Sequence, residues 1–305
     1  MAFGSCFAEN IGDKLNSLKY DIDINPFGIQ YNPVSIANAL ISILNERQYL
    51  ESDLTVHRNL WHSFDHHGDF SANSKDLCLQ NINKRLETSK LNISKTKFFL
   101  ITLGTSRVYY RKDNDKIVNN CHKFPADFFY NRRLSSEEIY TSLKIAFSQL
   151  LESNKDIQII LTVSPIRHLK DGFIENQLSK STLLLVSDML CRDFKQVHYF
   201  PAYEIMMDDL RDYRFYKTDL LHPNEVAVDY IYQRFEYCCL SEKETDLRKK
   251  IRNIMLSVQH KLLNPESEES RQFIQNQINN IEKICSDYHF LDFSTELNRY
   301  KMMPG

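Results

Sequence analysis

Hydrophobic residues along the chain occur either in short strand-like runs or at helical spacing. The strand-like runs predict β-strands at Met1–Gly4, Tyr20–Asn25, Lys97–Gly104, Gln158–Val163 and Val197–Phe200. Helical spacing predicts helices between them, for example at Ala8–Leu18, Pro33–Asn45, Ser135–Ser153 and Leu178–Phe194. The runs FFLITLG and IILTV are apolar on both faces, which is typical of parallel strands covered by helices on each side. This alternation predicts an α/β fold, a three-layer α/β/α flavodoxin-like parallel sheet.

The same pattern divides the chain into a main domain, residues 1–240, and a C-terminal extension, residues 241–305. Residues 48–97 are rich in His, Asp, Asn and Ser and are expected to form an insertion over one end of the sheet. In the extension, two amphipathic helical segments are separated by Asn264-Pro265 and predict a helical hairpin. This hairpin packs on the core in our first interpretation, and a homodimer through it is the alternative.

Composition and charge exclude several classes of function. The 305 residues are 42% hydrophobic and 26% charged, and the formal net charge of -2 gives no electrostatic reason to bind nucleic acid or an anionic membrane. The apolar runs are too short to span a bilayer. Seven cysteines without metal or disulfide spacing favour free thiols, no metal and a cytoplasmic protein. Since only MAF precedes Gly4, a longer natural N-terminus and export stay open.

Polar and turn residues follow the predicted strands, at the point where each strand ends. Because the carboxyl ends of parallel strands meet at one edge of a sheet, these residues are expected to form a site there. The endings are Gly4-Ser5, Asn25-Pro26-Phe27-Gly28, Gly104-Thr105-Ser106-Arg107 and Ser164-Pro165-Ile166-Arg167-His168.

Ser5 lies where a predicted strand turns into a helix, so it is either a helix N-cap or a nucleophile. A nucleophilic serine needs an oriented base, and Asp219-x-x-His222 offers one, because the carboxylate can bond Nδ1 of the imidazole and leave Nε2 for the serine. The order Ser, Asp, His recurs in convergent triads. The neighbouring Cys6 is expected to point away as the turn enters the helix.

Several long motifs resemble one known family. They are GSCFA, NPFGIQYNP, LGTSRVY, NCHK, VSPIRHLKDGF, YFPAYE, LRDYRFY and TDLLHPN, and they extend from Phe3 to Phe235. Together they resemble the GSCFA-domain family of bacterial proteins, which looks like a branch of the SGNH (GDSL-like) hydrolase superfamily. The resemblance implies a catalytic triad of Ser5, Asp219 and His222. It also implies that the backbone amides of Ser5 and Gly28 donate to the oxyanion.

One feature departs from the superfamily pattern. Its third block usually supplies an oxyanion-binding Asn, whereas here Gly104 is followed by Thr105 and Ser106. We expect Thr105 to take this role, with Asn120 of the NCHK segment as the alternative donor.

The remaining polar residues of these motifs are candidates for substrate binding. They are Ser106, Arg167, His168 and His122, with a structural hydrogen-bond network as the alternative for the last three. The resulting hypothesis is a serine esterase that acts without a cofactor on small O-acyl esters, including O-acetylated carbohydrate, through an acyl-enzyme. The alternatives are an O-acyltransferase with the same triad and a non-catalytic carbohydrate-binding module.

Overall fold

The protein consists of two compact units. The computed structural model describes residues 1–262 and 264–302. The first unit is formed by Met1–Gly12 and Ile22–Gln233, and the second by Asp13–Asp21 together with the chain from Arg234 onward. Within the described residues, no helix combines the length and the apolar character that crossing a bilayer requires.

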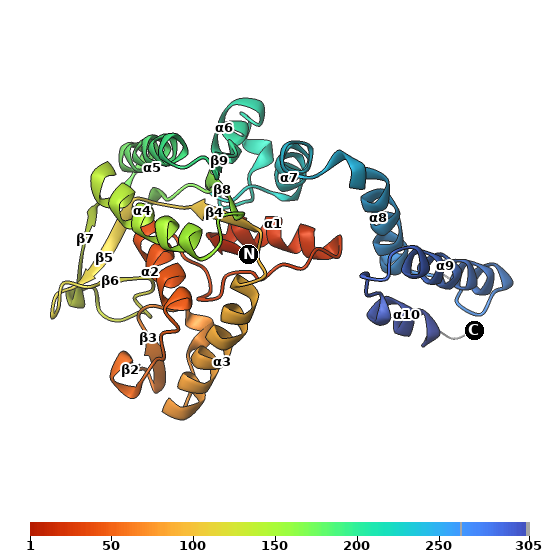
Figure 1. Cartoon of the computed structure of the whole chain (residues 1–305), viewed down its shortest axis with the longest axis horizontal. Coiled ribbons are helices and arrows are strands. Elements are labelled where there is room, and N and C mark those ends of the chain that lie inside the picture. Colours follow the sequence, from red (N-terminus) through yellow and green to blue (C-terminus); the bar gives the residue numbers. More distant parts are fainter. Residues whose placement is uncertain (263, 303–305) are drawn as a thin grey trace. The chain divides into compact units, whose positions relative to one another are not determined.

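A four-stranded parallel sheet forms the centre of the first unit, with the strand order β1-β4-β8-β9 (Figure 1). The strands are β1 (Ala2–Gly4), β4 (Phe98–Leu103), β8 (Gln158–Val163) and β9 (Val197–Tyr199). The central strands β4 and β8 carry the apolar runs, and most of their side chains are buried. The predicted α/β fold with a parallel sheet is therefore confirmed.

Helices lie on both sides of this sheet. Helix α4 (Ser136–Ser153) packs between α2 (Pro33–Leu44) and α5 (Phe173–Asp193). Helices α1 (Cys6–Ser17) and α7 (Glu225–Cys239) lie on the other side of the sheet, and α6 (Ala202–Glu204) follows β9 (Figure 1). This arrangement is consistent with three layers.

Helix caps fix where two of these helices begin. The side chain of Asn32 accepts a hydrogen bond from the Ser35 amide at 2.8 Å, and Pro33 occupies the first turn of α2. At α4, Ser135 and Glu138 form a reciprocal capping box.

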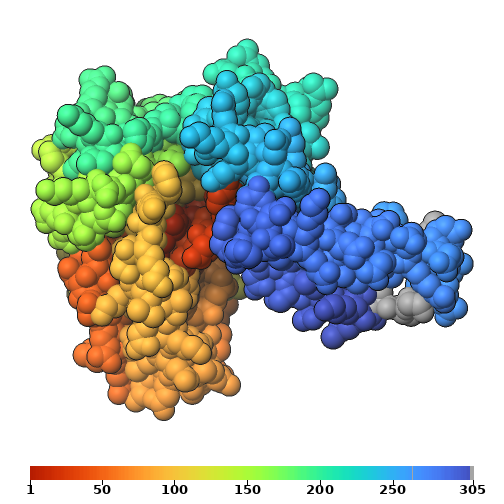
Figure 2. Space-filling view, turned by 45° about the vertical axis from the view of Figure 1, so that its right-hand side comes forward, coloured from red at the N-terminus to blue at the C-terminus, as the bar shows by residue number. Residues whose placement is uncertain are grey.

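Residues 48–133 contain elements that the hydrophobic pattern did not predict. A hairpin of β2 (Leu54–His57) and β3 (Leu60–Ser63) is followed by the long helix α3 (Lys75–Ile93). The outer face of α3 is exposed at the surface in the space-filling view (Figure 2, orange). A second, antiparallel sheet has the order β6-β5-β7. Its strands are β5 (Arg107–Arg111), β6 (Ile117–Val118) and β7 (Phe129–Arg133).

Two predicted boundaries were wrong. The segment Tyr20–Asn25 forms one parallel bridge, between Ala2 and Ile24, rather than a strand; its partner β1 is only three residues long, and Asn25 takes a left-handed conformation (φ 45°). Helix α5 begins at Phe173, directly after Gly172, rather than at Leu178.

The second unit is helical. Its helices are α8 (Thr245–Gln259), α9 (Glu268–Asp287) and α10 (Ser294–Lys301), and α10 packs on the other two. The two longer helices were predicted, while the short α10 was not. Isoleucines of α8 and α9 are buried at helical spacing, including Ile251, Ile254, Ile281 and Ile284.

Candidate active site

Ser5 lies at the junction of β1 and α1. The preceding Gly4 has a φ of 134°, and a side chain there would place Cβ 2.2 Å from the carbonyl oxygen of Thr102, so the chain can turn this sharply only with glycine. The Ser5 hydroxyl accepts a hydrogen bond from the Phe7 amide at 3.2 Å, which is the bond of a helix cap. Ser5 is fully buried.

The Ser5 hydroxyl also donates a hydrogen bond to the hydroxyl of Ser164, with 3.0 Å between the two oxygens. Ser164 directly follows β8, and β4 lies between β1 and β8 in the sheet. The two hydroxyls therefore meet across the carboxyl end of β4. The VSPIRH motif at the end of a predicted strand was the sequence signal for Ser164, although no contact with Ser5 was predicted.

A buried lysine supports this edge from α5. The Nζ atom of Lys180 lies 2.7 Å from the carbonyl oxygen of Gly104 and 2.7 Å from that of Ser164. Lys180 is fully buried, and desolvation lowers the pKa of its ammonium group to about 7. Lys180 could not be predicted from the sequence, because a single lysine in an amphipathic helix normally faces solvent.

Asp219 and His222 form the pair that their spacing predicted. The Nδ1 atom of His222 lies 2.6 Å from Oδ2 of Asp219, while Oδ1 accepts hydrogen bonds from the amides of Leu221 and His222 at 2.9 and 3.0 Å. These amides, the His222 one foremost, lower the pKa of Asp219 to about 2, so the carboxylate is ionised at neutral pH. The Nε2 atom of His222 has no hydrogen-bond partner among the described residues.

The loop that carries this pair lies at the same edge of the sheet as Ser5. The amide of Arg167, just after β8, donates to the carbonyl of Leu221 at 3.2 Å. Burial first, and then the proximity of Lys180 and His222, lowers the pKa of the His168 imidazole. Within the described chain, however, no hydrogen bond joins His222 to Ser5, whose hydroxyl is bonded to Ser164 instead.

Cys6 does not have the surroundings of an activated thiol. Burial raises its pKa, and the nearby charge of Lys217 opposes this only weakly. Its sulfur lies 3.8 Å from the hydroxyl of Tyr31.

Two of the expected oxyanion donors are already engaged. The Gly28 amide donates to the carbonyl of Asn25 at 2.8 Å, in a turn where Gly28 has a φ of 72°. The Thr105 hydroxyl lies 3.1 Å from that of Ser179 and accepts a hydrogen bond from the Arg107 amide at 3.1 Å. In this conformation neither group is directed at Ser5, and we withdraw both assignments.

Asn120 and His122 belong to a different part of the unit. The Asn120 amide donates to the Phe64 carbonyl, and the Asn120 side chain accepts from the His122 amide. The His122 ring is buried, its Nε2 lies 2.8 Å from the Ser63 carbonyl oxygen, and burial lowers its pKa to about 4. Both residues therefore hold the NCHK segment against the β2–β3 hairpin, and we correct their assignment to the site.

The other candidate substrate-binding residues, Ser106, Arg167 and His168, differ in the contacts that their side chains make. Ser106 is buried, with its amide and hydroxyl 2.8 and 3.1 Å from the Ser179 hydroxyl, so it is structural. The guanidinium of Arg167 packs on the Tyr216 ring at 4.2 Å. His168 has a buried Nε2 without a partner, and burial lowers its pKa to about 3. This unpartnered Nε2 of His168 lies near Gly104.

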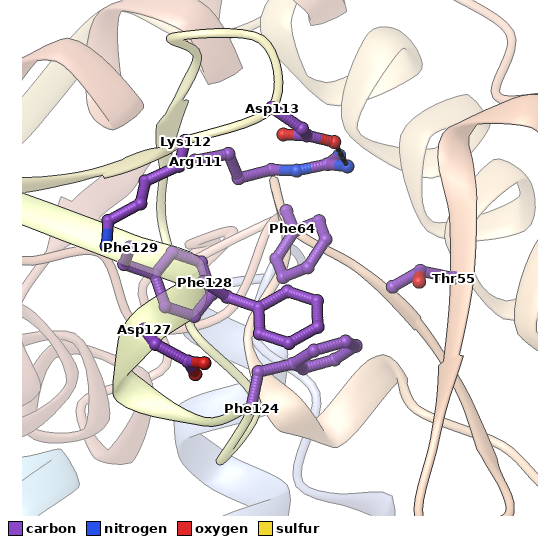
Figure 3. Close-up of a pocket in the computed structure, with 9 residues that line it drawn as sticks. All are labelled: Thr55, Phe64, Arg111, Lys112, Asp113, Phe124, Asp127, Phe128 and Phe129. Atoms are coloured by element: carbon purple, nitrogen blue, oxygen red, sulfur yellow. Dashed lines mark hydrogen bonds and ion pairs between the residues drawn. The ribbon is translucent and has the colours of Figure 1, made fainter.

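A separate pocket of about 310 Å³ lies between β2 and the second sheet (Figure 3). Phe64 and Phe129 are buried in its wall, whereas Phe128 is 53% exposed. Arg111 lies over the Phe64 ring, 4.7 Å from its centroid, and pairs with Asp113. The other lining residues are Thr55, Lys112, Phe124 and Asp127. This pocket was not predicted from the sequence, in which the aromatic run KFPADFF was the available signal.

The fold and this edge define an α/β protein with a parallel sheet, a strand-end serine and an Asp–His pair on a loop. The chain belongs to the GSCFA family, whose model matches residues 1–235. A second model, the GSCFA domain protein C-terminal domain, matches residues 234–301. No curated protein and no solved structure matches the chain.

Proposed function

We propose that the protein is a serine ester hydrolase of SGNH type, with Ser5 as nucleophile, His222 as general base and Asp219 as the group that orients the base. The observation that carries this proposal is the 2.6 Å bond between Asp219 and Nδ1 of His222, on a loop that contacts the end of β8 at the same edge of the sheet as Ser5. A neutral imidazole held at Nδ1 presents Nε2 as a proton acceptor. The ionised Asp219 stabilises the imidazolium that forms.

The reaction would proceed in two steps through an acyl-enzyme. Ser5 Oγ bonds to the ester carbonyl carbon, its proton passes to Nε2 of His222, and the carbonyl electron pair moves onto oxygen. The intermediate collapses, and the alcohol leaves with the proton from His222. Water then repeats the sequence on the acyl-enzyme and regenerates Ser5.

Ser5 is buried and donates to Ser164, and we interpret this as a resting arrangement of the proposed site. Attack requires that the Ser5 hydroxyl turn its proton from Ser164 to His222 and that the edge open to admit an ester. The Asp219 and His222 side chains are about 40% exposed, which suits a loop that moves for this purpose.

The substrate class we propose is a small O-acyl ester, such as an O-acetylated carbohydrate. An O-acyltransferase would use the same groups, with a sugar hydroxyl in place of water in the second step. Product analysis with an acyl donor, with and without candidate sugars, separates these outcomes. The unpartnered Nε2 of His168 is the group we expect to contact the substrate.

A fluorophosphonate probe and a short-chain aryl ester test the proposal. We expect wild type to be labelled and to hydrolyse the ester, and Ser5→Ala and His222→Ala to lose both activities. Cys6→Ala is the matched control, because it changes the adjacent residue and should keep most activity. Loss of activity in Cys6→Ala with survival in Ser5→Ala would assign the nucleophile to Cys6.

A non-catalytic carbohydrate-binding protein is the second candidate, and the aromatic pocket in Figure 3 favours it. The exposed ring of Phe128 can pack on the face of a sugar. The charged residues beside it can hydrogen-bond the sugar hydroxyls. If wild type is inert to the probe and binds a polysaccharide that Phe128→Ala no longer retains, this candidate replaces the hydrolase.

A further inference from the structure

We propose that Ser164 is a second catalytic hydroxyl, which donates a hydrogen bond to the oxyanion while Lys180 holds it in place. This inference rests on the proposed function of Ser5 as nucleophile. It names a side-chain donor that would act beside the Ser5 amide, because Gly28 and Thr105 are engaged elsewhere. Asn120 is bonded toward Phe64 and His122.

The hydrogen bonds of Ser164 leave its proton unused. A hydroxyl has one donor and two acceptor positions. The Ser164 oxygen accepts from the Ser5 hydroxyl at 3.0 Å and from the Ile166 amide at 3.3 Å. Within residues 1–262 and 264–302, no group accepts the Ser164 proton. Ser164 is also fully buried, so water does not compete for that proton in this conformation.

The position of Ser164 suits an oxyanion donor. The oxyanion forms two bonds away from Ser5 Oγ, on the carbon that Oγ attacks. A hydroxyl 3.0 Å from Oγ is therefore next to the developing charge, where effective donors lie about 2.7–3.1 Å from the oxyanion. When the Ser5 hydroxyl donates to His222 rather than to Ser164, the Ser164 hydroxyl can direct its own proton at the oxyanion.

Lys180 gives the Ser164 position its rigidity. Its Nζ joins the ends of β4 and β8 through the carbonyls of Gly104 and Ser164, each at 2.7 Å. The groups that face it are the His168 imidazole and the Tyr203 ring, whose centroid is 5.7 Å from Nζ. Neither is a carboxylate, so a charged Lys180 adds positive potential beneath the oxyanion. Lys180 is a positioning residue, because it touches the backbone of Ser164 and not Ser5.

Donation by Ser164 to the oxyanion does not change the proton balance of the attack by Ser5. The Ser5 proton goes to Nε2 of His222, and the carbonyl electron pair goes to the oxygen that Ser164 donates to. Ser164 keeps its proton throughout, and collapse of the intermediate returns the electron pair to the carbonyl. A donor of this kind acts mainly in the transition state, so its loss lowers kcat more than it changes KM.

The test compares Ser164→Ala with Ser106→Ala on one aryl ester. Both variants remove a fully buried hydroxyl at the same edge, but only Ser164 contacts Ser5. We expect Ser164→Ala to lower kcat by about 10²-fold, with KM within about threefold. Fluorophosphonate labelling of Ser5 should slow in parallel. Ser106→Ala should keep kcat within about fivefold of wild type, since its hydroxyl bonds only Ser179.

Ser164→Thr and Ser164→Cys guard against a folding defect. Threonine keeps the hydroxyl and should restore most of kcat, while cysteine keeps the shape but is a weak donor and should remain slow. Wild-type kcat in Ser164→Ala or in Ser164→Cys, with Ser5→Ala inactive, overturns this inference and leaves the proposed function standing. Equal hydrolysis and labelling by wild type and Ser5→Ala overturns both.

Discussion

At the scale of single residues, helix capping and catalysis by Ser5 are compatible. The cap uses a lone pair of the Ser5 oxygen, which accepts from the Phe7 amide, whereas the bond to Ser164 uses the proton. Of these two bonds, attack changes only the one that uses the proton, which passes from Ser164 to His222. The cap can remain in place and hold Oγ at the strand end while this happens.

Replacement of Asp219 by Asn tests the role of the His222 partner. An asparagine can keep the two amide bonds to Oδ1, but its NH2 group cannot accept the proton on Nδ1 of His222. We expect Asp219→Asn to retain the fold and lower kcat/KM by about 10- to 10³-fold on an aryl ester. Steady-state kinetics measure this, with a thermal melt as the folding control. An unchanged kcat/KM would show that the Asp–His pair only shapes the loop.

At the scale of elements, the sequence predicted those whose apolar pattern is long and continuous. Strands β4 and β8 and helices α2 and α4 were predicted within a residue or two because each buries a regular set of side chains. The second sheet was missed because its strands are short and alternate with charged residues such as Arg107 and Arg111.

The site was predictable only where its residues are neighbours in the sequence. Asp219 and His222 are one turn apart, so their contact follows from spacing. The contact of Ser5 with Ser164 joins two strands that are not adjacent in the sheet, and no local pattern encodes it. Burial of Lys180 depends likewise on which carbonyls face α5, which only the assembled sheet determines.

Because Lys180 in α5 is buried, we expect the free energy of unfolding to depend on pH. In the unfolded chain a lysine has a pKa of about 10.4, whereas burial lowers the pKa of Lys180 to about 7. Between pH 7 and 10 the unfolded state therefore binds more protons, so the free energy of unfolding contributed by this group rises with pH. Its slope approaches about 1.4 kcal/mol per pH unit.

Denaturation by urea at several pH values from 7 to 10 measures this slope, with Lys180→Met as the comparison. The methionine cannot titrate, so its curve should lack the rise that wild type shows. Lys170→Met is a matched control on the surface, because Lys170 is exposed and bonds Tyr109. Parallel curves for wild type and Lys180→Met would mean that burial does not alter protonation of this lysine.

At the scale of the whole molecule, burial opposes the protonation of His62 and, more strongly, of three further histidines of the first unit. Burial lowers the pKa of His66 to about 3, of His122 to about 4 and of His168 to about 3. An unfolded histidine has a pKa of about 6.5. Their contribution to stability is complete above that pH and is lost as the pH falls from about 6.5 toward the folded values, because the unfolded state then binds the extra protons.

Each of the three contributes a slope of up to about 1.4 kcal/mol per pH unit, so acidification from pH 6 to 4 should remove several kcal/mol. This is a large share of the roughly 5–15 kcal/mol that stabilises a typical domain. We therefore expect the first unit to unfold in mild acid, well before its carboxylates protonate fully. The single tryptophan, Trp61 in β3, gives a fluorescence signal for this unit.

His66→Phe isolates one contribution. The His66 ring is fully buried, its Nε2 has no partner, and it stacks on Phe27 with 4.4 Å between ring centroids, so a phenyl ring keeps the packing and cannot titrate. The variant loses only the bond to the Ser63 hydroxyl and should be within about 2 kcal/mol of wild type at pH 7. Its free energy of unfolding should fall less steeply than that of wild type between pH 6 and 4, because His66 no longer titrates while His62, His122 and His168 still do. His289→Asn, at an exposed site of the second unit, should follow the wild-type Trp61 signal. If His66→Phe loses stability with acid as steeply as wild type, another group drives the acid unfolding of this unit.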